Sequence, residues 1–349
     1  DIAITAKLVG SDLSSNCLIS AVTYNRDPDW AAYRAAIKNG TIREMVDIGD
    51  VIVDTWTDTT ANKEYEFNWI VADFRKVTLE DGSEVDAMYL MAKNSLPFGT
   101  PFAQGTKLVA SEDTAQKGVF YYGYNGSTYT MLDIADGEPL PKEQYTNIYK
   151  TLLDCSKVPA DTSSRFNEVT SYGLSRWEFS AARQYLNSNA DAGNWFEPKI
   201  LSDICSYASQ RAGFLSGFSA AFQDALVPIK VQTVRNTTID NGETDVTYDK
   251  MFLPSHEEVY MGAVGSAYSG IEGEAWEYYK KMATSPTAGN IAARAIIPLG
   301  ATSAGSSWLR SANLAYPASE CVINSAGGRN RNYSYNSYRF APACAITAS

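Results

Sequence analysis

Histidine is almost absent from this chain, and several catalytic motifs are missing. The one histidine is His256, so a Ser-His-Asp or Cys-His triad would have to use it as the base. The chain has no G-x-S-x-G turn to present a nucleophile, and no G-x-G-x-x-G or G-K-[ST] loop to cradle a phosphate. These gaps disfavour hydrolysis, and we expect a protein that is not an enzyme, with no catalytic residue and no cofactor.

Cysteine is scarce, and its spacing is wrong for a metal site. The chain has five cysteines and no C-x-x-C pair, so neither a zinc site nor a thioredoxin-like motif is indicated. Cys321 and Cys344 could face each other on adjacent C-terminal strands and form a disulfide, but buried free thiols are the commoner outcome. The Asp240–Asp245 loop carries acids around a glycine without the spacing of a calcium loop. We therefore expect no metal site.

Long apolar runs and an excess of basic charge are also missing. No stretch approaches the roughly 18 to 20 apolar residues of a membrane helix, which predicts no membrane insertion. The net charge is −11, and a nucleic-acid partner would need a basic surface, so none is expected. The chain begins at Asp1 without Met or an apolar leader. Such a start fits a trimmed virion protein and a secreted protein equally well.

Aromatic residues and strand-like patterns are plentiful. The 349 residues are 45% hydrophobic and include 22 tyrosines, which suits a large, strand-rich globular protein. Apolar runs at 51–53, 67–72 and 87–91 predict a β-meander. Asn125-Gly126 between two aromatic runs predicts a hairpin.

Helical spacing alternates with these strands. Asp27-Pro28-Asp29 offers a helix start and Gly40 a helix stop, which predicts a helix between them. We expect further helices over 142–161 and 175–186, helical parts between 200 and 222, and a short helix over 257–261 after a strand at 251–253. Ser255 would be the N-cap of that short helix and Glu258 its capping acid, so His256 is interpreted as structural. The pattern predicts a mixed α/β, or α+β, fold class.

The C-terminal segment has the composition of a recognition surface. Residues 330–338 contain only Asn, Tyr, Ser and Arg, between two stretches that resemble core strands. Tyrosine provides rigid contact area at a low entropy cost, and Asn and Ser provide adaptable hydrogen bonds, as in antibody paratopes. This composition indicates binding chemistry, although a plain Tyr-rich polar hairpin is the alternative.

Several motifs here resemble one known family. The Trp308-Leu309-Arg310-Ser311 opening, the Gly327-Gly328 turn and the 339–343 close look like the end of a C-type-lectin-like fold. They resemble the variable proteins of diversity-generating retroelements and a related domain family common in phages and gut bacteria. The stretches 177–187 and 248–258 support the match, with Pro254 standing where the family pattern has a leucine. The resemblance covers roughly residues 48–349.

The resemblance implies a domain plan and a diversified site. Residues 1–47 would be an N-terminal attachment or oligomerisation extension, and residues 48–349 a C-type-lectin-like domain with a variable region at about 307–343. In that family an error-prone reverse transcriptase randomises adenines, often in AAC codons, which yields residues such as Tyr and Ser or leaves Asn. The residues expected to be exposed on one face and to bind ligand are Asn313, Tyr316, Asn330, Asn332, Tyr333, Tyr335, Asn336 and Tyr338, with Tyr333, Tyr335 and Tyr338 as anchors.

Other expectations concern the scaffold around that site. If residues 330–338 form a strand, Tyr333, Tyr335 and Ser337 should face one way. Trp308, Leu309 and Phe340 should belong to the scaffold, and Arg310 and Arg339 should be tied by hydrogen bonds to backbone or acids.

The function implied is binding of a host cell-surface protein or glycan by a phage-borne, diversified receptor-binding protein. Its location would be the virion surface, or alternatively the outside of a cell. Other virion proteins and further copies of the chain remain open as partners. One alternative is a structural virion protein with a fixed lectin-like domain, such as a capsid decoration or fibre component. Another is an enzyme of the formylglycine-generating type, although Cys321 and Cys344 do not reproduce its cysteine pattern. The 40 acidic residues also leave a two-carboxylate glycosidase open.

Overall fold

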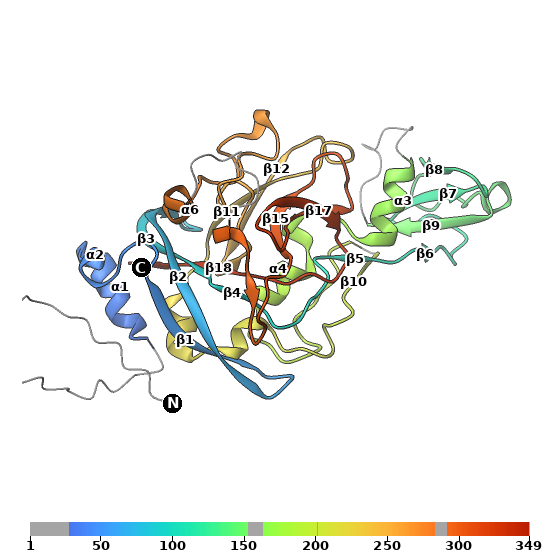
Figure 1. Ribbon diagram of the computed structural model, residues 1–349. Coiled ribbons are helices and arrows are strands. Elements are labelled where there is room, and N and C mark those ends of the chain that lie inside the picture. Colours follow the sequence, from blue (N-terminus) through green and yellow to red (C-terminus); the bar gives the residue numbers. More distant parts are fainter. Residues whose placement is uncertain (1–27, 153–162, 201, 283–291, 349) are drawn as a thin grey trace, which may run out of the picture.

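A five-stranded antiparallel sheet forms the centre of the protein (Figure 1). The computed structural model describes residues 28–152, 163–200, 202–282 and 292–348. In spatial order the strands are β1 (Val51–Asp58), β2 (Lys63–Thr78), β3 (Glu84–Ala92), β18 (Ala343–Thr347) and β13 (Met251–Phe252). The predicted strands at 51–53, 67–72, 87–91 and 251–253 are confirmed. Because β18 pairs with both β3 and β13, the end of the chain is built into its centre.

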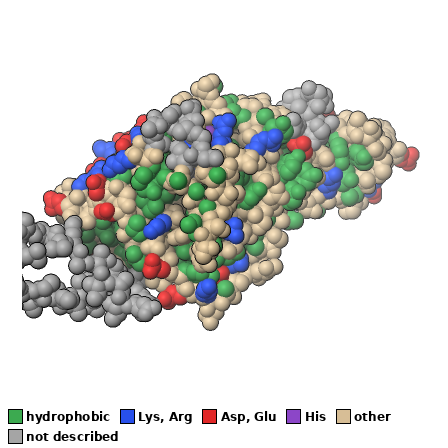
Figure 2. Space-filling view, in the orientation of Figure 1, with side chains coloured by type: hydrophobic (Ala, Val, Ile, Leu, Met, Phe, Trp, Pro, Cys, Tyr) green, Lys and Arg blue, Asp and Glu red, His purple; other side chains and the backbone are tan. Residues whose placement is uncertain are grey.

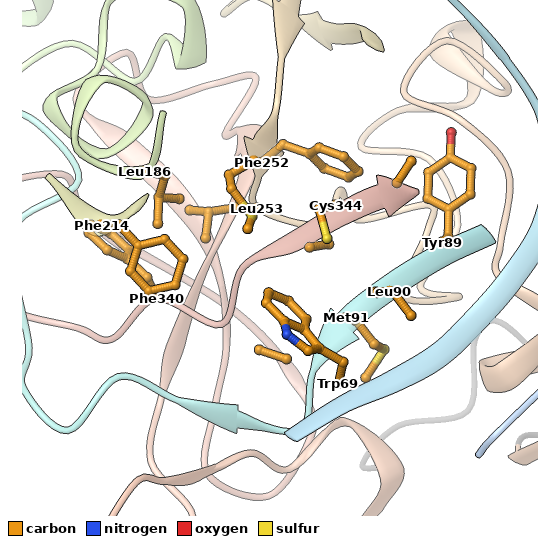
Figure 3. Packing of buried hydrophobic residues seen from close by; sticks show 14 of the residues in the cluster. Trp69, Tyr89, Leu90, Met91, Leu186, Phe214, Phe252, Leu253, Phe340 and Cys344 are labelled. Atoms are coloured by element: carbon orange, nitrogen blue, oxygen red, sulfur yellow. The ribbon is translucent and has the colours of Figure 1, made fainter. Parts of the chain in front are cut away.

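The core lies against this sheet and is made of side chains from distant parts of the chain. Figure 3 shows Trp69 of β2, Leu90 of β3, Cys344 of β18 and Leu253 meeting in one cluster. All four are fully buried, and removing one such side chain from water stabilises the fold by about 1.5–3 kcal/mol. Cys344 is a free thiol, as is Cys321, so the disulfide considered between them is not formed.

The first described helix belongs to this core. Helix α1 (Trp30–Asn39) begins at the predicted cap, where the Asp29 carboxylate accepts a hydrogen bond from the backbone N–H of Ala32. It ends at Gly40, whose φ of 72° is the left-handed conformation that glycine adopts without strain. Trp30 is buried against Phe222 of α5 (Ala220–Ala225), with ring centres 4.7 Å apart. The attachment role expected for residues 1–47 stays a prediction.

A small four-stranded lobe projects from one side of the protein (Figure 1). Its strands, in spatial order, are β6 (Leu108–Val109), β9 (Asn147–Thr151), β7 (Phe120–Tyr124) and β8 (Tyr129–Leu132). The lobe has its own buried cluster, which includes Tyr121, Leu140 and Ile148. The hairpin predicted at Asn125-Gly126 is confirmed, although its loop has four residues and is closed by the pair Tyr124 and Tyr129. Figure 2 shows hydrophobic side chains gathered on this lobe.

Two predicted helices are wrong where the structure describes them. Within 142–161, a 3-10 turn η1 (Lys142–Gln144) leads into strand β9, and residues 153–162 lie outside the described part. Pairing of Tyr149 with Tyr122 of β7 outweighs the local helical spacing. Residues 257–261 form turns, which end where Tyr260 has a φ of 59°. The expected capping bonds are nevertheless present, because Ser255 and Glu258 each accept a hydrogen bond from the other's backbone N–H.

The helix predicted over 175–186 is divided in two. A 3-10 turn η3 (Trp177–Phe179) precedes α4 (Ala181–Leu186), and the Ser180 hydroxyl caps α4. The remaining helical elements are α2 (Ile42–Met45), α3 (Ser163–Tyr172), η4 (Phe214–Gly217), η5 (Ser266–Tyr268), α6 (Glu277–Met282) and η6 (Ala292–Arg294). The short paired strands are β4 (Asn94–Ser95) with β14 (Ile297–Pro298), β5 (Gln104–Gly105) with β10 (Asp203–Ile204), and β11 (Ile229–Val234) with β12 (Thr244–Asp249).

Helices and strands together establish the α+β class. In the part of the chain that the structure describes, no helix has both the length and the apolar character needed to cross a membrane.

Candidate ligand-binding surface

The candidate surface is built on a separate three-stranded sheet. Its strands are β15 (Ser307–Ala312), β16 (Ser319–Ile323) and β17 (Arg329–Tyr333), paired antiparallel in that order. All residues of β15 and β16 are buried, whereas the first three of β17 are exposed. The sheet therefore presents its last strand to solvent and is fixed by the other two.

Backbone hydrogen bonds hold the segment that follows β17. The carbonyl oxygens of Ser334, Tyr338, Phe340 and Pro342 accept hydrogen bonds from backbone N–H groups between Ala92 and Phe102, at 2.7 to 2.9 Å. These bonds do not depend on which side chains the segment carries. Residues 334–342 can thus keep one path while their exposed side chains differ.

Three of the expected scaffold residues are buried beneath the surface. Trp308, Leu309 and Phe340 are fully buried. The Trp308 indole donates a hydrogen bond to the Thr100 carbonyl oxygen at 3.0 Å. The Arg339 Nε is buried without a hydrogen-bond partner among the described residues, so this atom is not tied as expected. The Arg339 backbone carbonyl accepts a hydrogen bond from the N–H of Trp308.

Arg310 joins the sheet to the 255–262 turn, as expected of a tied arginine. Its guanidinium donates to both carboxylate oxygens of Glu258 and to the carbonyl oxygens of Leu253 and Glu272. Glu258 is buried, so this is a desolvated, doubly hydrogen-bonded ion pair. The next residue, Ser311, accepts a hydrogen bond from the N–H of His256 at 2.8 Å and donates to a Glu272 carboxylate oxygen.

The eight expected ligand-binding residues gather on and around β17, but most are half-buried. Asn330 and Tyr335 are exposed, with 42% of Tyr335 accessible. The other six are half-buried, namely Asn313, Tyr316, Asn332, Tyr333, Asn336 and Tyr338. The expected exposure is therefore confirmed for two of the eight and is only partial for the other six, because these side chains pack on one another and on the scaffold.

One group of them forms a tyrosine cluster. The ring of Tyr172, at the end of α3, lies 4.8 Å from that of Tyr333 and stacks on Tyr335 at 5.0 Å. The centres of the Tyr333 and Tyr335 rings lie 6.1 Å apart. Strand β17 ends at Tyr333, and a turn closed by the Asn336 N–H and the Tyr333 carbonyl oxygen follows. The turn brings Tyr333 and Tyr335 together, where strand alternation had been expected to do so.

A second group is an amide network. The Asn332 side chain donates to the Tyr338 hydroxyl and accepts a hydrogen bond from the amide of Asn336. Tyr338 also packs edge-on against Trp308, with ring centres 5.0 Å apart. This group therefore connects the surface to the buried scaffold.

The third group lines a cavity at the other end of β17. Asn313 and Asn330 lie on its wall together with Arg329, Arg331, Cys321 and His256. The Arg331 guanidinium carbon lies 3.6 Å from the centre of the Tyr316 ring, a cation–π contact. The sequence-based site list lacked Tyr172, Arg331 and His256. Arg331 lies inside the Asn/Tyr/Ser run and could have been chosen, whereas nothing in the sequence linked Tyr172 to β17.

Metal-binding and reactive side chains are the other candidates for chemistry at this surface. No group of three or more His, Cys, Asp or Glu side chains in the described ranges is arranged to hold a metal ion. The acids of the Asp240–Asp245 loop are partly used in structure, since Asp245 accepts hydrogen bonds from Arg176 and Arg235. Burial raises the pKa of the Cys321 thiol well above its usual range, so Cys321 is a poor nucleophile.

The chain belongs to a protein family described as a domain of unknown function, DUF6273, whose model matches residues 149–348. The matched region runs from β9 to β18 and includes the whole candidate surface. Strands β1, β2 and β3 of the central sheet precede it. No curated protein and no solved structure matches the chain.

Proposed function

We propose that this protein binds a ligand on a host cell surface through a C-terminal surface that a retroelement diversifies. In this proposal the domain is C-type-lectin-like, and the protein sits on a phage particle or, alternatively, on the outside of a cell. Host proteins or glycans are the proposed ligands. Several copies could act together, and the gain from multivalent display would compensate for weak single sites.

One observation carries the proposal. The backbone of β17 and of the 334–342 segment is held by β16 and by residues 92–102. Exposed positions such as Asn330 and Tyr335 can therefore change without loss of the conformation that presents them. A surface under repeated diversification needs this separation between a fixed path and replaceable side chains.

The genetic test is to sequence the gene and its flanks. We expect a near-copy of the coding sequence for residues 307–343 whose differences fall at adenines, close to a reverse-transcriptase gene. A flank without such a copy would remove the diversification part of the proposal and favour a fixed structural virion protein.

The binding test compares matched surface variants of the purified protein on host cells. We expect Tyr335→Ala combined with Asn330→Ala to weaken cell binding at least tenfold, because central aromatic anchors carry much of the energy of an interface. The control combines Met45→Ala with Asn39→Ala in α1 and α2. Met45 is 47% exposed, close to the 42% of Tyr335, and these helices lie at the left edge of the molecule in Figure 1, away from β17 near its middle. Equal loss of binding in both pairs would contradict the proposed surface.

A further inference from the structure

The cavity at the end of β17 has an unusual balance of charge. Its volume is about 320 Å³, near the lower end of the roughly 300–1,000 Å³ of small-molecule pockets. Arg329 and Arg331 both line it and, two apart on one strand, lie on the same face. Figure 2 shows blue side chains on the surface over β15 and β17. Within the described residues neither arginine has an ion pair with an acid, although the chain carries a net charge of −11.

The two asparagines of the cavity have their acceptor oxygens occupied. The Asn330 side-chain oxygen accepts the N–H of Arg331 at 2.8 Å, and that of Asn313 accepts the N–H of Ala315 at 3.2 Å. The Asn313 amide NH₂ group makes no hydrogen bond with any described residue and can donate to a ligand. The Asn330 side chain, between the two arginines on the strand, points to the other face of β17. The wall is therefore rich in donors.

His256 supplies a hydrogen-bond acceptor to the same cavity wall. It is 1% exposed, and its Nδ1 lies 2.6 Å from the Gly262 carbonyl oxygen. A carbonyl only accepts, so Nδ1 carries the proton. Burial lowers the His256 pKa to about 4, and nearby Arg329 and Arg294 contribute. The ring is thus neutral near pH 7, and its Nε2 is an acceptor.

We propose that this cavity binds an acidic sugar, with its carboxylate between Arg329 and Arg331, a hydroxyl donating to His256 Nε2, and another oxygen accepting from the Asn313 amide. Guanidinium groups match carboxylates with paired hydrogen bonds. A simple carboxylate such as acetate has no hydroxyl and would leave the histidine acceptor without a donor. The inference rests on the proposed function in that it assigns a ligand class to one part of the same surface.

The test titrates the purified full chain with sodium glucuronate, glucose, acetate and inorganic phosphate, followed by ligand-observed NMR. We expect glucuronate to bind at least tenfold more tightly than the other three, because it alone offers both a carboxylate and ring hydroxyls. Equal binding of acetate or phosphate would reduce the cavity to a general anion site and overturn the inference. Absence of glucuronate binding would overturn it as well.

Variants then locate the binding. Arg329→Gln with Arg331→Gln should weaken glucuronate binding at least tenfold, whereas Arg43→Gln, an exposed arginine in α2, should leave it unchanged. Unchanged binding in the double variant would contradict the site. Because both cavity arginines are exposed, the double variant should fold, and its thermal melting temperature checks this.

The two proposals can fail separately. Loss of cell binding in the Tyr335 and Asn330 variant, together with no glucuronate binding by the natural protein, would keep the proposed function and reject the acidic sugar. Tight glucuronate binding, with cell binding insensitive to that variant, would keep the cavity and reject the wider surface.

Discussion

The buried carboxyl groups around Arg310 outnumber the positive charges that could pair with them. Among the described residues, the Arg310 guanidinium donates to the carboxylate of Glu258 and to no other carboxylate. The Glu272 carboxyl group instead accepts hydrogen bonds from the Val234 N–H and the Ser311 hydroxyl. Both Glu320 oxygens are buried without a partner among the described residues. Burial raises the pKa of Glu320 well above its usual range, and nearby Glu272 raises it further. A protonated Glu320 is the state that this environment favours.

Glu272 should make stability depend on pH. Burial raises its pKa from 4.5 to about 7, so the folded protein holds this proton more tightly than the unfolded chain does. The stability that the group contributes is complete below about pH 4.5 and is lost as the pH rises to about 7. Glutamine has the same shape and does not titrate. In Glu272→Gln, the free energy of unfolding relative to the natural protein should therefore rise by about 2 kcal/mol between pH 5 and pH 8.

Denaturant unfolding at the two pH values measures this difference. Burial also raises the pKa of Asp203 to about 7 and lowers that of His256 to about 4. Both residues are present in both proteins, so their own titration cancels in the comparison. Glu84→Gln, at the exposed first residue of β3, controls for the loss of one negative charge. A relative stability of Glu272→Gln that does not change with pH would refute the role of this carboxyl.

In the small lobe, one close contact between the backbone and a tyrosine ring should affect the stability of all four strands. Gly123 of β7 lies under the Tyr145 ring, and a Cβ at this position would come within 2.4 Å of it. We expect Gly123→Ala to destabilise the lobe by about 1–3 kcal/mol, because the ring has to move. Hydrogen exchange should then speed up across residues 120–151 and remain slow in β2 and β3, since the lobe has its own core.

The matched control is Thr130→Ala, directly opposite Gly123 on β8 and exposed. It should leave exchange in the lobe nearly unchanged. Faster exchange throughout the protein in Gly123→Ala would show instead that the lobe and the central sheet unfold as one unit.

Elements with a local cause could be predicted from the sequence, and those with a distant cause could not. Asp29 and Gly40 bracket α1 because capping is a local interaction. The spacing over 142–151 resembled a helix, but β9 is fixed by its partner Tyr122 on another strand. The same limit applies to the site. The composition of residues 330–338 indicated a surface, whereas Tyr172 and His256 join it only through the folded arrangement.

At the scale of the whole molecule, the first and last described elements support each other. Helix α1 packs on β3, β18 and α5, and β18 lies between β3 and β13 in the central sheet. The segment that carries Tyr335 and Tyr338 leads directly into β18. The presentation of the candidate surface therefore depends on a strand that the N-terminal helix covers.

Replacement of Trp30 tests this connection. Trp30 is 1% exposed and packs on Phe222, and truncation of such a buried tryptophan costs about 3–5 kcal/mol. In Trp30→Ala we expect the free energy of unfolding to fall by that amount and amide exchange to accelerate in β18 as well as in α1. Lys38→Ala, an exposed change in the same helix, should alter neither. If exchange accelerates in α1 and stays slow in β18, then the helix is a separable attachment segment, as the boundary expected at residue 48 implies.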